Sequence, residues 1–147
     1  MDYATNGDVA ERLGQTLYVQ LTDDAGSGTA DEDRVSEARL AAEGLVNSYL
    51  GRRYRVPVDV TAHAEVAAVL RSVVVDVAAY RLHMRRRPVP ADVERLHDRA
   101  LWWLELVATG KAVLPAVMAL EGADAEGAAL ASEGPARMVS RELLEGL

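Results

Sequence analysis

Acidic residues gather in the segment DDAGSGTADED, residues 23–33, and carboxylates are the groups that bind calcium. A helix–loop–helix calcium site needs acidic or amide ligands at alternating positions, glycine at the sixth position and glutamate at the twelfth. Counted from Asp23, the sixth position is Gly28, but the third is Ala25 and the twelfth is Arg34. The segment therefore predicts a solvated loop that leads into a helix, and no metal site.

Other residues with catalytic or ligand chemistry are few and unfavourably spaced. The chain has no cysteine, and no two of His63, His83 and His97 lie on adjacent turns of one expected helix. The sequence has neither a G-x-S-x-G turn nor a glycine-rich phosphate loop. We therefore expect no catalytic residue, no cofactor and no bound metal.

Arginine forms two clusters, Arg52-Arg53-Tyr54-Arg55 and Arg85-Arg86-Arg87, in a chain with one lysine. Arginine pairs with carboxylates or phosphates in bidentate fashion and desolvates readily, so these clusters suit a protein interface as well as DNA. Their partners could be acidic residues of a neighbouring copy, such as those at 31–33. A solvated surface or direct DNA contact are the alternatives. The formal charge of −7 argues against a general nucleic-acid binder.

The charge is also uneven along the chain. Residues 23–51 carry −5 and residues 52–87 carry +5. A protomer polarised in this way can meet a copy of itself head to tail.

The spacing of apolar residues predicts that mainly helices position these residues. Thr5 and Asp8 form a weak capping box for a short helix ending at Gly14, and residues 15–23 fit a helical turn or an extended piece. Thr29 and Glu32 form a full capping box for a helix over about 30–50, which Gly51 ends. Its apolar face is Val35, Ala38, Ala42, Leu45, Val46 and Tyr49.

Two further helices follow an extended connector around Pro57. Thr61 is the expected cap of a helix over about 62–86, which is apolar on nearly every side and so belongs at the centre of a bundle or in an oligomer. Its valine-rich stretch 73–77 leaves a strand as the alternative. Pro90 opens a helix over about 91–109 that Gly110 ends, with Val93, Leu96, Ala100, Trp103, Leu104 and Val107 as its buried face.

Composition agrees with an all-α fold. The 147 residues are 50% hydrophobic but only 5% aromatic, without phenylalanine, so the core must come from alanine, valine and leucine. We predict a small bundle of about four helices with extended connectors over residues 1–115. Residues 116–147 form an alanine- and glycine-rich tail with a short terminal docking element. No run approaches the roughly 20 apolar residues of a membrane span.

Four short motifs, in order over about residues 3–115, resemble the head–tail connector proteins of Mu-like phages. The first is the N-terminal segment with a helix start, and the second is a helix end that runs into R-Y-x-hydrophobic-Pro. The third is the family's third-helix motif, and the fourth is the last helix with the residues that follow it. In this sequence they are Tyr3-Ala4-Thr5 with Asp8, Arg12 and Leu21-Thr22-Asp23; Tyr49–Pro57; Asp76–Leu82 with Arg85-Arg86; and Leu101–Leu104 with Gly110-Lys111 and Leu114-Pro115. The stretch 116–134 departs from the pattern.

The resemblance implies a structural protein of the phage neck, present in the virion and in the host cytoplasm during assembly. Members are thought to form a ring, commonly dodecameric, below the portal protein. The ring continues the channel for double-stranded DNA and carries the next neck or tail-terminator protein. No enzyme activity, cofactor or membrane is implied. The alternative function is a helical DNA-binding or regulatory module that uses the arginine clusters.

Three predictions about contacts follow for such a ring. The two arginine clusters lie at contacts with another subunit or the portal. The acidic face of the helix at about 30–50, with Asp31, Asp33 and Glu37, faces the channel. Residues 116–147 are held by other chains, through Met138, Val139, Leu143 and Leu144.

Overall fold

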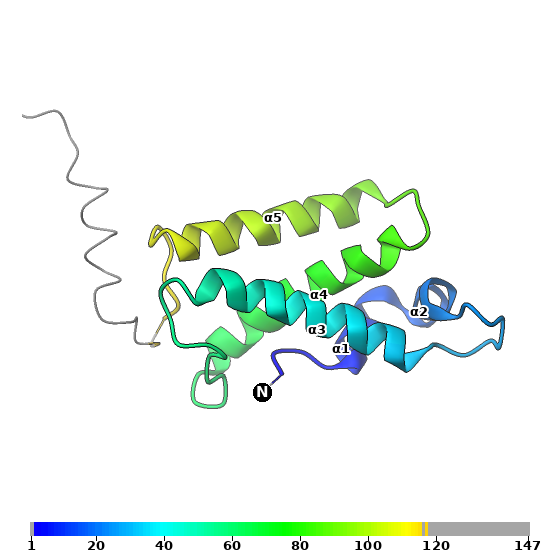
Figure 1. Cartoon of the computed structure of the whole chain (residues 1–147), viewed down its shortest axis with the longest axis horizontal. Coiled ribbons are helices and arrows are strands. Elements are labelled where there is room, and N and C mark those ends of the chain that lie inside the picture. Colours follow the sequence, from blue (N-terminus) through cyan, green and yellow to red (C-terminus); the bar gives the residue numbers. More distant parts are fainter. Residues whose placement is uncertain (1, 116, 118–147) are drawn as a thin grey trace, which may run out of the picture.

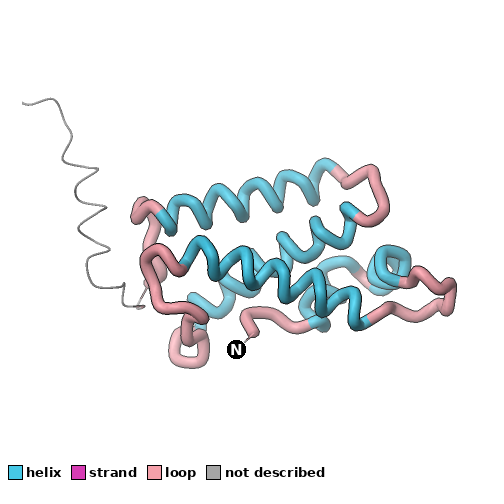
Figure 2. Tube along the Cα trace, viewed as in Figure 1, coloured by secondary structure: helices cyan, strands magenta, loops and turns pink. Residues whose placement is uncertain are grey.

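Helix α4, Ala64–Met84, is the element against which the four other helices pack. The structure is a computed structural model that describes residues 2–115 and 117. In this part of the chain it contains α1 (Asn6–Leu13), α2 (Gln15–Thr22), α3 (Glu32–Leu50), α4 and α5 (Ala91–Ala108), and no strand. The expected all-α fold is confirmed, with five helices in place of about four (Figures 1 and 2).

The N-terminal segment contributes two short helices. The capping box of α1 is present, since the Thr5 side chain accepts from the Asp8 N–H and Asp8 accepts from the Thr5 N–H. Gly14 has φ 77°, which allows the chain to turn and begin α2 at the next residue. The segment 15–23, for which two conformations were open, is therefore helical and raises the helix count.

The N-cap of helix α3 lies two residues later than expected. Asp31 is the N-cap, and its carboxylate accepts from the N–H groups of Asp33 and Arg34 at 3.0 and 3.3 Å. The predicted box of Thr29 and Glu32 is wrong, because the Glu32 carboxylate instead accepts from the Tyr18 hydroxyl at 3.0 Å. The Glu32 carboxylate, which the capping box required, is engaged in this tertiary contact.

Helix α4 is buried on most sides, as its composition predicts, and the strand alternative for residues 73–77 is wrong. Its N-cap is His63 and not Thr61, whose hydroxyl donates to the Asp59 carboxylate at 2.6 Å. Figure 1 shows α4 running opposite to α3 and α5, which places it at the centre of the bundle. The buried residues of α4 are Val66, Leu70, Val73, Val74, Val75, Val77, Ala78, Ala79, Leu82 and His83.

Helix α5 buries its C-terminal half more deeply than its N-terminal half. Ala100, Leu104 and Val107 are buried, whereas Leu96, also expected in the core, is 40% exposed. The helix starts after Pro90, and Gly110 (φ 78°) follows its C-cap, as predicted. The exposed half of the apolar face is therefore available for contacts outside the bundle.

A buried ion pair fixes the chain before α1 to α3. Glu43 Oε1 accepts from Arg39 Nη1 at 3.1 Å and from the backbone N–H groups of Tyr3 and Ala4 at 3.0 and 3.3 Å. Both charged side chains are about nine-tenths buried. The Tyr3 hydroxyl donates to Asn47 and accepts from the Val58 N–H, so the same segment also holds the connector after α3.

Candidate functional site

The first arginine cluster divides into buried and exposed members at the C-terminal end of α3. Arg53 and Tyr54 are buried, at 6% and 2% exposed. The Tyr54 hydroxyl accepts from the Leu114 N–H at 3.0 Å, and the Arg53 guanidinium lies against Gly110. These two residues therefore tie the α3 end to the exit of α5 within one protomer. Arg52 and Arg55 are exposed, and only their side chains are free to reach another molecule.

The second cluster is engaged by the acidic loop of its own chain. Arg85 forms an ion pair with Asp24 and donates to the Leu21 carbonyl at 2.5 Å. Arg86 donates to Asp24 and to the Asp23 carbonyl, each at 3.3 Å. Arg85 and Arg86 thus have an acidic partner, Asp24, within the protomer, where the sequence suggested residues 31–33 of a neighbouring copy. Arg87 is exposed, and its guanidinium donates a hydrogen bond to the sulfur of Met84 at 3.7 Å.

The loop between α2 and α3 organises its own carboxylates. Asp23 accepts from the N–H groups of Gly28 and Ser27 at 2.7 and 3.0 Å, and these bonds lower the pKa of its carboxyl group. Asp24 faces Arg85 and Arg86. Across residues 2–115 and 117, no group of three or more histidines or carboxylates is arranged to hold a metal. The loop therefore connects the end of α2 to the end of α4 through these ion pairs and hydrogen bonds.

The candidate channel residues lie at the start of α3. Asp31 is the N-cap, Asp33 is exposed, and the Glu37 side chain is 74% exposed and pairs with Arg34 at 3.7 Å. Arg34 also pairs with Asp31 at 3.8 Å, so it links two of these carboxylates. The tail contacts predicted at Met138, Val139, Leu143 and Leu144 lie outside the described residues.

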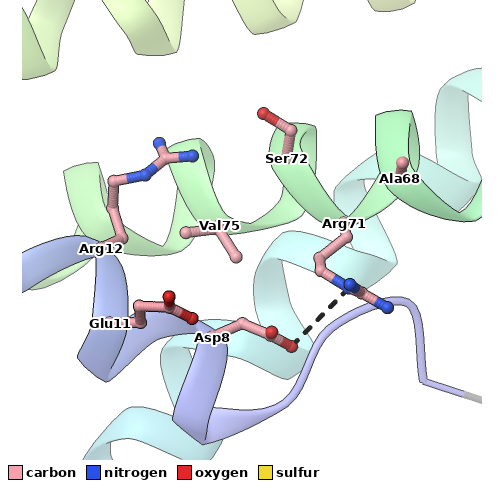
Figure 3. A pocket seen from close by; sticks show the side chains of 7 residues that line it. All are labelled: Asp8, Glu11, Arg12, Ala68, Arg71, Ser72 and Val75. Atoms are coloured by element: carbon pink, nitrogen blue, oxygen red, sulfur yellow. Dashed lines mark ion pairs between the residues drawn. The ribbon is translucent and has the colours of Figure 1, made fainter.

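A surface groove that sequence reasoning missed runs over α4, between α1 on one side and α5 on the other. Figure 3 shows its α1 end, where Asp8, Glu11 and Arg12 face Ala68, Arg71, Ser72 and Val75 of α4. Arg71 pairs with Asp8 at 3.9 Å, and Arg12 pairs with Asp76. The hydrogen bonds from Thr5 are the main reason that the pKa of Asp8 is lowered, with Arg71 adding to the effect. This end of the groove is therefore polar and internally paired.

The other end of this groove is apolar. A hollow of about 330 Å³, here called the α4–α5 groove, is lined by Val69, Ser72, Val73, Asp76, Leu96, Arg99, Ala100, Trp102 and Trp103. Trp102 is 61% exposed, Val69 42% and Leu96 40%. A neighbouring hollow adds Leu13, Leu17 and Val93. Four of the seven exposed large apolar side chains of the described residues, Leu17, Val69, Leu96 and Trp102, thus line this one surface.

The histidines occupy structural positions. His63 precedes α4, His97 stacks on Tyr80 with ring centroids 3.8 Å apart, and His83 is buried. Burial lowers the pKa of His83, and the charge of Asp92 opposes that shift. No helix of the described residues has the length and hydropathy needed to cross a membrane.

One family model matches the chain, over residues 3–132, and its description is "Bacteriophage Mu, Gp36". No match was found among curated proteins. The matched range includes all five helices and continues past the last described residue.

Proposed function

The chain belongs to the bacteriophage Mu Gp36 family, and on that premise we propose that it is the subunit of a ring that joins a phage head to its tail. Membership makes it a phage protein of the structural or morphogenetic class, found in the virion or in the host cytoplasm during assembly. The ring, its position below the portal protein and the absence of a catalytic role are our proposals. The observation that carries them is the family match over most of the chain.

The charges at the two ends of α3 support a head-to-tail contact. Asp33 and Glu37 are exposed near the first turn, and Arg52 and Arg55 are exposed just after the last turn. The 19 residues of the helix separate them by roughly 28 Å. A surface that is acidic at one end and basic at the other favours a heterologous contact between copies, and such contacts form rings when the rotation closes.

The same acidic surface fits a channel for DNA. Carboxylates on the wall repel phosphates, so DNA passes without binding tightly. We therefore keep Asp31, Asp33 and Glu37 as proposed channel residues, and those that the arginines of the next copy leave uncovered would face the DNA. The number of copies, the portal contact and the next neck or tail-terminator protein follow from the proposed ring.

The competing function, a DNA-binding module, loses part of its basis. Arg85 and Arg86 are occupied by Asp24, which leaves Arg52, Arg55 and Arg87 as the exposed members of the two clusters. A DNA-binding protein needs a continuous basic surface for phosphate contacts. The ion pairs at Asp24 therefore favour a structural role for this part of the molecule.

Particle images and mass measurements of the purified full chain, alone and with a portal protein, test the proposal. We expect closed rings, or ring-shaped additions to the portal. A chain that stays monomeric and ignores the portal would contradict it. DNA affinity that falls steeply with salt, in the absence of rings, would establish the competing function.

A further inference from the structure

The α4–α5 groove has the surface of a docking site. Val69, Leu96 and Trp102 expose apolar area there although most large apolar side chains of the described residues are buried. An exposed apolar surface of this kind marks a contact with another polypeptide or a ligand. The occupant must therefore supply apolar side chains.

The charged residues of the groove also indicate that its occupant carries a negative charge. Arg99 lines it, and no described residue forms an ion pair with Arg99, whereas the other charged group, Asp76, is paired with Arg12. A guanidinium at the edge of an apolar surface gains most from a carboxylate. The occupant should thus carry leucine-like side chains next to an acidic one.

The C-terminal sequence of the chain has this combination. In MVSRELLEGL, residues 138–147, Val139 and Leu143 are four residues apart, and Glu142 lies three residues after Val139. On a helix such spacing places the two apolar side chains and the carboxylate on adjacent positions. Residues 121–147 carry a net charge of −4, which complements an arginine-bearing surface.

The chain is long enough to deliver this segment to a neighbour. Residue 117 packs beside the core near Leu114, and twenty residues, 118–137, separate it from Met138. Twenty residues span at most about 70 Å when extended. That length exceeds the roughly 27 Å length of α5, so the segment can extend beyond its own protomer.

We propose that residues 138–145 of one copy bind in the α4–α5 groove of the next copy, with Leu143 against Trp102 and Glu142 beside Arg99. The inference rests on the proposed ring, because the ring brings the copies together. A segment that leaves one protomer and enters the next is a heterologous contact, so it repeats at every interface. It would give each pair of neighbouring copies a second contact besides the one at the ends of α3, and because this contact is tethered it would raise the avidity of the assembly.

The two tryptophans of the chain report on this contact, since both line the groove. In the assembled full-length protein we expect tryptophan emission at shorter wavelength than in the Leu143→Asp variant. Loss of one buried leucine should lower the ratio of bound to free segment by at least about tenfold. Leu130→Asp, the same change in the alanine- and glycine-rich segment, is the matched control and should leave the emission unchanged.

Mixing two variants distinguishes a contact between copies from one within a copy. Leu143→Asp has an intact groove, and Arg99→Glu has an intact C-terminal segment, so neither alone should show the full shift. In an equal mixture, segments of the second variant can fill grooves of the first. With random mixing around the ring, one interface in four joins an intact segment to an intact groove, so about a quarter of the shift should return. The double variant Arg99→Glu/Glu142→Arg should recover binding on its own, because the charge pair is restored with opposite signs.

Each outcome decides the inference. Equal emission in wild type and Leu143→Asp overturns the contact, and a shift that mixing never restores overturns its placement between copies. Rings in the particle images together with equal emission of wild type and Leu143→Asp would contradict this inference but agree with the proposed function. Absence of rings would count against the proposed function itself.

Discussion

Glu43 holds the N-terminal segment through a single carboxylate oxygen. Oε1 accepts from two backbone N–H groups and from Arg39, in a site from which water is largely excluded. Arg39 Nη1 also donates to the Ala4 carbonyl at 3.0 Å. Removal of Glu43 leaves the backbone N–H groups of Tyr3 and Ala4 without their buried acceptor and takes one of two carboxylates from Arg39, which keeps its ion pair with Asp2 at 3.2 Å.

We predict that Glu43→Ala lowers the free energy of unfolding by about 3 kcal/mol. Urea unfolding followed by circular dichroism measures this. Glu37→Ala is the control, because Glu37 makes an exposed pair with Arg34 at 3.7 Å and its loss should cost about 0.5 kcal/mol or less. Equal losses in the two variants would show that the buried pair contributes nothing special.

Sequence spacing contained a signal for this pair. Arg39 and Glu43 are four residues apart, as in an ordinary surface pair, yet both fall among Val35, Ala42 and Val46 on the apolar stripe of α3. Their position predicts burial, but the groups that make burial tolerable, Tyr3 and Ala4, lie about forty residues away. A charge on an apolar stripe can be recognised from one sequence, whereas its distant partners cannot.

His83 makes stability depend on pH. Because burial lowers its pKa in the folded protein, the unfolded chain binds more protons at this site as pH falls below the ordinary histidine value of about 6.5. Stability should therefore decrease as pH falls from 7 to 5, and His83→Gln should remove part of that decrease. Urea midpoints at both pH values test this, with His63→Gln as the control that retains it. The lowered pKa values of Asp8 and Asp23 act at more acidic pH, where protonation of these groups costs further stability.

At the scale of elements, the apolar period determined the three long helices within about two residues of their observed ends. The caps were harder to predict because several residues compete for each helix start. Thr29 and Asp31 are both good caps, and the choice depends on Glu32, whose carboxylate accepts from Tyr18 and Asn6. Residues 15–22 remained ambiguous because eight residues contain too few helical turns for a period.

The cap of α3 can be tested directly. Asp31→Ala removes the acceptor for two N–H groups of the first turn and should lower stability by about 1 kcal/mol. Thr29→Ala should change it by less than about 0.5 kcal/mol, since it removes only an exposed hydrogen bond between the Thr29 and Ser27 hydroxyls. Thermal or urea unfolding measures both. The reverse order would restore the original assignment of the cap.

Two glycines provide a second test at this scale. Gly110→Ala places a Cβ at positive φ and 2.2 Å from Arg53 Nη1, so it should destabilise the protein by more than about 1 kcal/mol. Gly44→Ala lies in the interior of α3 with open space around the new Cβ, and it should stabilise the protein by about 0.5–1 kcal/mol. Opposite signs in unfolding experiments would support the left-handed backbone of Gly110 together with the close packing of Arg53 against it. A neutral Gly110→Ala would argue against it.

At the scale of the whole molecule, the candidate surfaces depend on packing that one sequence does not show. Arg85 and Asp24 are 61 residues apart, and only the fold brings the second arginine cluster onto the acidic loop. The α4–α5 groove arises because Leu96 lies in the N-terminal half of α5, which extends beyond the core, and because Trp102 lies on an exposed side of the same helix. Periodicity assigned Leu96 to the core, because it gives the face of a helix but not how far a neighbour covers it.

Assembly should depend on the two exposed arginines at the end of α3. We predict that Arg52→Glu/Arg55→Glu weakens association of copies by at least about tenfold, because like charges would then meet in the proposed contact. The monomer should keep its helical content by circular dichroism, since neither side chain is buried. Arg81→Glu/Arg95→Glu, two exposed arginines outside the proposed contact, is the control. Unchanged assembly in the first variant, measured by sedimentation, would exclude this contact.

The central position of α4 has a consequence for synthesis on the ribosome. Chains leave the ribosome from the N-terminus, and domains fold only when their parts have emerged. Until residues 64–84 emerge, α1, α2 and α3 lack the helix against which each of them packs. The first sixty residues therefore emerge with the apolar faces that α4 later covers still exposed, and in this interval they are open to chaperones and to aggregation.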